Sequence, residues 1–255
     1  MKKQLLLLAF VSFFTCTAFG QEYKLARSSG KLVIKEVNHL TLEGTSGNEI
    51  VFVSLDGSDE KDKRAAGLRA ISSMGLEDNT GLGLAVLDKG TTYEVYQLKK
   101  MDGPRVKILV PKGVAISIIH SSPYGDDIKL KNIESEIESS TVHSGIHLEN
   151  VTGPMNIKTV HGEIEANFNA GIKSPVRLVS THGPVDITLP QAVKATMTMS
   201  TTYGEIYVDP AFKLEMETKG DLVKYSSNSV NGKINGGGLE IELKSTHNSI
   251  YLRNK

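Results

Sequence analysis

Residues 128–133, Ile-Lys-Leu-Lys-Asn-Ile, return 18 positions later as Ile-His-Leu-Glu-Asn-Val at residues 146–151. The correspondence extends beyond this stretch, because Thr-Val-His at residues 141–143 is repeated at residues 159–161. Within these units apolar and polar residues alternate, and an alternation of period two is typical of a β-strand with one buried face. The chain is therefore expected to consist of short strands in a repeated unit.

A short motif separates the strands along the second half of the chain. Ser or Thr comes first, His, Tyr or Asn comes two residues later, and Gly usually follows. We expect the Gly to supply a positive φ angle at each corner and the Ser or Thr hydroxyl to bond to free backbone groups. The corner position is occupied by Tyr124, His143, His161, His182, Tyr203, Asn231 and His247.

The spacing of about 20 residues discriminates among the all-β architectures. Propeller blades take about 40 residues or more, and sandwiches do not repeat at the level of residues. A solenoid coil of about 18–25 residues stacks on the previous coil, with strands about 4.8 Å apart. The sequence therefore predicts an all-β fold, a parallel β-solenoid (β-helix) over residues 109–255, with coils of about 18–21 residues. Ile128, Ile146 and Ile164 are expected in one interior column.

Residues 21–108 have a less regular pattern and are predicted to form an irregular N-terminal cap with the first irregular coils. Strands are expected at residues 32–35 and 50–54, followed by a hairpin that turns at residues 88–90. Residues 63–71 give a helical pattern, which predicts one short helix in the cap. A cap fits a solenoid, because an open end would expose apolar core and unpaired strand edges.

Residues 1–20 are predicted to be a signal peptide. Two lysines at positions 2 and 3 form a positive n-region, an apolar run covers residues 5–14, and small residues occupy positions 18 and 20. This pattern predicts cleavage before Gln21. The apolar run is too short for a transmembrane helix, which takes about 20 residues, so none is expected.

Cys16, the one cysteine of the chain, lies inside the predicted signal peptide. Residues 13–15 lack the small residue that a lipidation motif places just before its cysteine, so a lipid anchor is the minor alternative. Cleavage would leave no thiol, which excludes disulfides, thiol catalysis and cysteine-ligated metals. The mature protein is expected in the periplasm, at the cell surface or secreted.

The charge balance bears on possible partners. The chain of 255 residues carries 29 Lys and Arg against 29 Asp and Glu, without a basic run. Nucleic-acid binding needs clustered cations to neutralise phosphates, so nucleic acid is not an expected partner. Hydrophobic residues make up 39% of the chain and recur throughout it, which favours a folded domain. Separately, we expect the protein to be a monomer.

Further motifs resemble a known family. Residues 63–70 read Lys-Arg-Ala-Ala-Gly-Leu-Arg-Ala, and residues 74–83 read Met-Gly-Leu-Glu-Asp-Asn-Thr-Gly-Leu-Gly. Residues 109–114 read Leu-Val-Pro-Lys-Gly-Val, and His-Gly corners follow. Together with the signal peptide, these features resemble the bacterial "putative adhesin" family of exported β-strand-repeat domains of unknown function. The resemblance covers essentially all of the chain after residue 20. It implies a right-handed β-solenoid, an envelope or surface location, and no established active site.

The sharpest candidate for a site is a column of imidazoles, contributed by His143, His161, His182 and His247. In stacked coils these rings would lie about 4.8 Å apart, close enough for two of them to share a metal ion. The competing interpretation is structural, with each His packed over the next corner and bonded to a turn carbonyl. Tyr124, Tyr203 and Asn231 at equivalent positions favour the structural role. We therefore predict no catalytic, cofactor-binding or metal-binding residue.

Other chemistry finds little support in the sequence. Acidic clusters at residues 56–60 and 125–127 lack the Asp ladder of calcium-binding β-rolls and the spacing of an EF-hand, so they are expected to be solvated turns. The motifs of serine hydrolases, zinc proteases and phosphate-binding loops do not occur. A polysaccharide lyase would need clustered acids beside a basic catalyst, whereas acids and bases here are spread singly along the strands.

Two function classes follow. The favoured one is an exported, non-catalytic, adhesin-like protein of the envelope or cell surface that binds or scaffolds an envelope protein or glycan through its solenoid faces. The alternative is a carbohydrate-active enzyme, of polysaccharide lyase or hydrolase type, on a β-helix. A cleft with clustered acids of raised pKa would favour the enzyme, and a flat face of mixed charge would favour binding.

Overall fold

The computed structural model describes residues 21–56, 64, 67–68, 71–168, 171–216 and 228–255. The predicted signal peptide, with Cys16, lies outside these residues, and so does most of the predicted helix at residues 63–71. The described part of the chain is all-β and contains no α-helix. None of these residues belongs to a helix long and apolar enough to cross a membrane.

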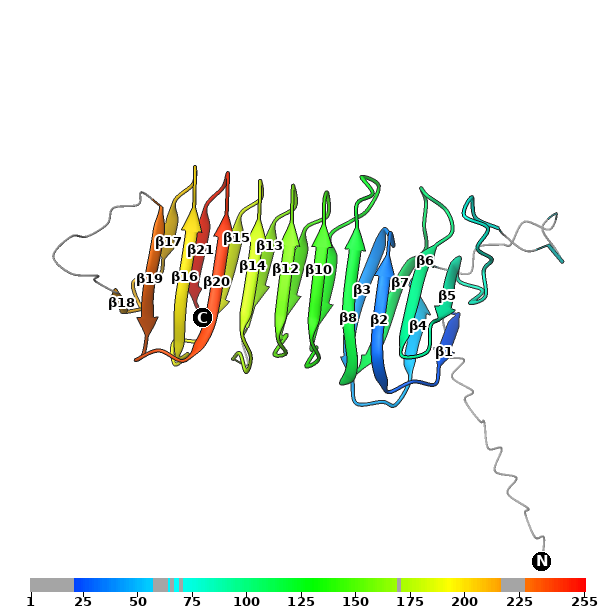
Figure 1. The fold of residues 1–255 in the computed structure, drawn as a ribbon, viewed down its shortest axis with the longest axis horizontal. Helices are drawn as coiled ribbons and strands as arrows, with labels where there is room; N and C mark the ends of the chain where they lie inside the picture. Colours follow the sequence, from blue (N-terminus) through cyan, green and yellow to red (C-terminus); the bar gives the residue numbers. More distant parts are fainter. Residues whose placement is uncertain (1–20, 57–63, 65–66, 69–70, 169–170, 217–227) are drawn as a thin grey trace, which may run out of the picture.

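The strands form two mixed sheets, named here sheet A and sheet B, which face each other as two layers (Figure 1). Sheet A has ten strands in the order β1 (Glu22–Leu25), β4 (Ile50–Ser54), β7 (Arg105–Pro111), β3 (His39–Thr45), β9 (Ile128–Lys131), β11 (Ile146–Glu149), β13 (Ile164–Asn167), β15 (Val185–Leu189), β21 (Ile250–Asn254) and β17 (Ile206–Val208). Sheet B has eleven strands in the order β18 (Leu214–Met216), β19 (Ser229–Ile234), β16 (Ala195–Thr201), β20 (Leu239–Ser245), β14 (Val176–Ser180), β12 (Met155–Thr159), β10 (Ile137–Thr141), β8 (Gly113–His120), β2 (Ser29–Lys35), β6 (Thr92–Gln97) and β5 (Leu84–Asp88).

The centre of the molecule is solenoid-like. From β8 to β15 the chain alternates between sheet B and sheet A, so that two strands make one coil, and strands of neighbouring coils pair in parallel. Ile128 pairs with Ile146, and Ile146 pairs with Ile164. All three side chains are 0% exposed, so the predicted interior column is confirmed.

The coils do not follow sequence order at the two ends. The last coil, β20–β21, lies between the coil β14–β15 and the coil β16–β17 (Figure 1). At the other end, β2–β3 lies between β6–β7 and β8–β9. The expectation that every repeat stacks on the previous one is therefore wrong at both ends.

The expectation of a wholly parallel solenoid is also wrong. Antiparallel pairs occur at the ends, where β1 pairs with β4, β4 with β7, β5 with β6, and β19 with both β16 and β18. The physical reason is the exposed edge of a terminal coil, whose free N–H and C=O groups are covered when a neighbouring segment folds back onto it. The predicted hairpin that turns at residues 88–90 is confirmed as β5–β6.

One apolar cluster fills the space between the sheets along the stack, from Leu84 in β5 at one end to Ile234 in β19 at the other. Alternate residues of each strand point into it, as the period-two pattern predicts. The corner of the chain after β9 and after β11 is turned by Asn132 and Asn150, which adopt φ angles of 54° and 53°. Asn tolerates this left-handed region better than most residues, so the repeated Asn marks a repeated turn.

The interior column predicts the result of introducing a charge. Ile146→Asp should abolish cooperative thermal unfolding, because the carboxylate would lie between Ile128 and Ile164 without a partner, which costs several kcal/mol. Ser140→Asp, at an exposed position of β10, is the matched control and should change the unfolding free energy by less than about 0.5 kcal/mol. Circular dichroism melts of both variants provide the measurement. A parental melting temperature for Ile146→Asp would contradict the register.

Candidate functional site

The corners that follow β10, β12, β14, β20 and β16 bring five exposed rings into one stack, named here the ring ladder. Ring centroids are 5.4 Å apart for His143 and His161, 4.8 Å for His161 and His182, 4.6 Å for His182 and His247, and 4.9 Å for His247 and Tyr203. The planes of neighbouring rings differ by 7–14°. The predicted column is confirmed, and its order follows the sheet rather than the sequence.

Backbone and hydroxyl groups hold the corners below the ladder. Ser180 Oγ accepts a hydrogen bond from Gly183 N at 2.9 Å and donates one to Gly162 O in the next coil at 3.1 Å. Thr159 Oγ1 accepts from Gly162 N at 3.1 Å, and Ser245 Oγ donates to Gly183 O at 2.9 Å. The predicted role of the hydroxyls is confirmed. In the described residues these imidazoles make no hydrogen bond to a turn carbonyl, so stacking and the backbone fix the rings.

The corner glycines do not supply the predicted positive φ angles. Gly162, Gly183 and Gly204 do not adopt positive φ angles. A Cβ atom on Gly183 would lie 2.0 Å from the carbonyl oxygen of Gly162, and one on Gly204 would lie 2.1 Å from that of Asn248. Each corner therefore needs Gly because the backbone of the next coil occupies the position of a side chain.

Two residues do not belong to the ladder. Asn231 lies inside β19, where it pairs with Thr198 of β16, so its assignment to a corner is wrong. Tyr124 lies in the connection between β8 and β9, and no ring stack joins it to His143 in the described part of the chain. Only Tyr203 of the three expected equivalents takes its predicted place.

The geometry of the ladder does not suit a shared metal ion. The lone pair of an imidazole nitrogen lies in the ring plane, so the lone pairs of parallel stacked rings run side by side and do not converge. Partial burial between its neighbours, together with the charge that His247 and His161 can carry, lowers the pKa of His182. The neutral form of the His182 imidazole is therefore favoured.

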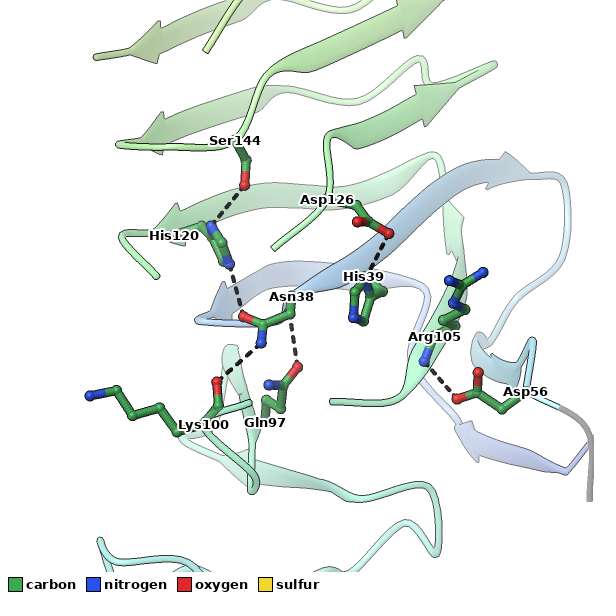
Figure 2. Close-up of polar contacts among 9 residues, drawn as sticks. All are labelled: Asn38, His39, Asp56, Gln97, Lys100, Arg105, His120, Asp126 and Ser144. Carbon is green, nitrogen blue, oxygen red and sulfur yellow. Dashed lines mark hydrogen bonds and ion pairs between the residues drawn. The ribbon is translucent and has the colours of Figure 1, made fainter. Parts of the chain in front are cut away.

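A buried polar cluster, shown in Figure 2, joins the N-terminal coils to the central ones. His120 is 1% exposed, with Nε2 at 3.2 Å from Asn38 Oδ1 and Nδ1 at 3.1 Å from Ser144 Oγ. Asn38 N–H donates to Gln97 Oε1 at 2.9 Å, and Asn38 Nδ2 donates to Lys100 O at 3.1 Å. Burial lowers the pKa of His120. Sequence analysis did not identify His120, because its register partner in the next coil is Thr141 and not one of the repeated histidines.

The acidic clusters have partners within the protein. Asp56 Oδ2 accepts from Arg105 N at 2.8 Å, and Asp126 Oδ2 lies 2.7 Å from His39 Nδ1 (Figure 2). Asp127 Oδ1 accepts from Gly145 N at 2.6 Å. Each of these carboxylates thus holds a turn or a strand start against its neighbour.

The fold is that of an all-β repeat domain whose coils stack into a solenoid-like body. A family model described as Toastrack DUF4097 matches residues 107–253, more than half of the chain, and the chain belongs to this family of domains of unknown function. The resemblance drawn from the sequence is thereby confirmed.

Two solved structures are similar over most of their length. One is a "putative cell adhesion protein" from Clostridium sporogenes ATCC 15579, with 14% identity over 92% of this chain and 99% of that chain and a TM-score of 0.43. The other is a "putative adhesin" from Bacteroides fragilis NCTC 9343, with 11% identity over 92% of this chain and 96% of that chain and a TM-score of 0.37. A comparison with curated proteins found no match.

The close approach at the corners predicts a large effect of one methyl group. Gly183→Ala should lower the unfolding free energy by about 3 kcal/mol, because its Cβ would overlap the carbonyl of Gly162 and force the coils apart. Gly47→Ala is the matched control, since its nearest atom would be Thr45 Oγ1 at 3.4 Å, and its effect should stay within about 1 kcal/mol. Urea unfolding of both variants measures the difference. Equal midpoints would contradict the close approach.

The histidines predict that acid weakens the fold. The folded-state pKa values of His182 and His120 lie below that of an unfolded His, about 6.5, so the unfolded chain binds more protons as the pH falls from about 7 to about 5. The melting temperature should therefore be lower at pH 5 than at pH 7. His161→Asn combined with His182→Asn should reduce this difference and cost less than about 5 °C at pH 7. A parental melting temperature that does not fall with acid would contradict the prediction.

Proposed function

We propose that this protein is an exported, non-catalytic, adhesin-like protein of the envelope or cell surface, which binds or scaffolds an envelope protein or glycan through the outer face of sheet A. Its export rests on the predicted signal peptide with cleavage before Gln21. Its coils are proposed to wind in the right-handed sense, since parallel strands of one sheet joined by a crossover, such as β8 and β10, do so in about 98% of cases.

The observation that carries the proposal is an aromatic and cationic patch on the C-terminal part of sheet A. Tyr207 and Tyr251 stack with their ring centroids 5.2 Å apart, and the Arg253 guanidinium lies 5.3 Å from the centre of the Tyr251 ring. Arg253 also donates to Asp186 Oδ2 at 2.7 Å, which fixes its position. Tyr and Arg are enriched among the residues that dominate binding energy at interfaces, because they offer large rigid contact area and several donors.

The rest of the sheet A face supports a broad contact. Lys131 pairs with Glu149 at 2.7 Å and Lys107 pairs with Glu43 at 3.3 Å, so charges of both signs alternate from coil to coil. A depression of about 300 Å³ lies on this face. It is lined by Lys129, Lys131, His147, Leu148, Glu149, Glu165 and Asn167. A flat face of mixed charge suits a partner of large area.

The electrostatics favour binding over glycoside cleavage. A catalytic carboxylic acid needs a raised pKa so that it holds its proton at neutral pH. Here the hydrogen bond from Lys35 lowers the pKa of Glu94, and the one from Lys112 lowers the pKa of Glu134. Such carboxylates are ionised, and each of the two serves as an ion-pair partner of a lysine.

The patch predicts which substitutions weaken attachment. Labelled protein beginning at Gln21 should co-sediment saturably with envelope fractions, and Tyr207→Ser combined with Arg253→Ala should weaken this binding at least about tenfold. Tyr124→Ser is the matched control, since Tyr124 is 47% exposed and Tyr207 is 49% exposed, but Tyr124 lies outside the patch. The control should bind as the parent does.

Two outcomes would overturn the proposal. The first is equal binding by the patch variant and the parent, or no saturable binding by either. The second is the release of new sugar ends from a polysaccharide panel by the purified protein, which would establish the carbohydrate-active alternative. Far-ultraviolet circular dichroism of each variant separates lost binding from lost folding.

A further inference from the structure

A second group of polar side chains gathers where three neighbouring strands of sheet A begin. Lys129, His147 and Glu165 pair in register on the outer side of β9, β11 and β13. The residues two positions earlier on the same three coils are Asp127, Gly145 and Glu163. None of these residues belongs to the ring ladder or to the patch around Tyr207.

The contacts of His147 assign roles to its two ring nitrogens. Its Nδ1 lies 2.9 Å from Glu165 Oε2, an ordinary hydrogen-bond distance, while its Nε2 lies 3.3 Å from Asp127 Oδ2. If Nδ1 carries the one N–H of a neutral imidazole, Glu165 Oε2 can accept it. The lone pair of Nε2 is then directed at Asp127.

Gly145 makes room for a third ligand. It stands between Asp127 and Glu163 in the stack and has no side chain, so both carboxylates can reach toward His147 across it. Its N–H donates to Asp127 Oδ1 at 2.6 Å, so that Asp127 Oδ2 is the oxygen that faces His147 Nε2. One ligand atom from each of Asp127, His147 and Glu163 lies within 4.8 Å of the others.

We propose that Asp127 Oδ2, His147 Nε2 and a Glu163 carboxylate oxygen bind one Zn²⁺ ion, with Glu165 as a positioning residue. Two ligands at about 2.0–2.1 Å from a tetrahedral ion are about 3.3 Å apart, which is the separation of Asp127 Oδ2 and His147 Nε2. A carboxylate that holds the far nitrogen of a ligating His is a usual partner of such sites. Three protein ligands leave the fourth position of the ion to water.

The ligand set also selects the ion. Ca²⁺ and Mg²⁺ take oxygen ligands, whereas an imidazole with two carboxylates suits Zn²⁺. Lys129 lies in register beside His147, and its long exposed side chain can turn away from the site to solvent. The proposal replaces the sequence-based expectation of no metal-binding residue, and it stands independently of the proposed function.

The same contacts would arise without a metal if a protonated His147 formed ion pairs with Asp127 and Glu165, and the experiment separates the two cases. The chelator-treated, purified chain is titrated with ZnCl₂ at pH 7.5 in a calorimeter. One equivalent of Zn²⁺ should bind to the parent. His147→Gln and Glu163→Gln should each weaken Zn²⁺ binding at least about tenfold. Glu165→Gln should weaken it about 10–100-fold. His161→Asn combined with His182→Asn is the control and should bind as the parent does.

A second readout is the imidazole nitrogen spectrum of the chain, in which Zn²⁺ should shift the Nε2 resonance of His147 and leave those of the ring ladder unchanged. Three results would overturn the site. These are no binding by the parent, unchanged binding by a folded His147→Gln variant, or loss of binding in the ladder variant alone. Melting curves show that each variant is folded before its titration is interpreted.

Discussion

Hydrogen bonding between the backbones of adjacent coils is the constraint on which the rest of the structure depends. His161 N–H donates to Val142 O and His182 N–H donates to Val160 O, both at 2.8 Å, and this ladder holds the strand spacing near 4.8 Å. The corners can keep this spacing only if no side chain lies between their backbones. For this reason a glycine, Gly183, faces the carbonyl of Gly162. The ring ladder is a consequence of that spacing, since parallel rings 4.6–5.4 Å apart are what identical corners produce.

The repeat at an offset of 18 residues was sufficient to predict the central coils and the column of Ile128, Ile146 and Ile164. It could not predict the order of the end coils, because the alternation Ile241-Glu-Leu243-Lys fits equally well beside any strand of sheet B. The strands with which β20 pairs depend on how the preceding strand, β19, folds back onto β16. The motif at Asn231 misled for a related reason, since Ser-Val-Asn-Gly is also compatible with a strand that alternates its faces.

The candidate sites differ in how much of them the sequence contains. The register that pairs Lys129, His147 and Glu165 follows from the same offset of 18 and could have been read from it. The sequence does not contain the turn of Asp127 toward Gly145, which depends on the hydrogen bond to a backbone N–H of the next coil. The gap left by Gly145 likewise has meaning only once its two neighbours in the stack are known. The pattern of residue types thus predicts which residues lie in register on neighbouring strands. The direction of each side chain is known only from the structure.

The stacking of coils restricts which charged side chains can occupy equivalent positions of neighbouring strands. Residues at equivalent positions are brought within one strand spacing, so like charges in one row would repel and opposite charges attract. The chain meets this with pairs such as Arg177 and Glu242 at 2.8 Å, and with a lowered pKa at His182, which lies between two other imidazoles of the ring ladder. Such pairs are explained by the fold and need no ligand. The stack of Tyr207 on Tyr251 is a contact between uncharged rings, so charge balance does not explain it. The proposed function rests on that stack, and the proposed zinc site rests on the acids that lie around His147.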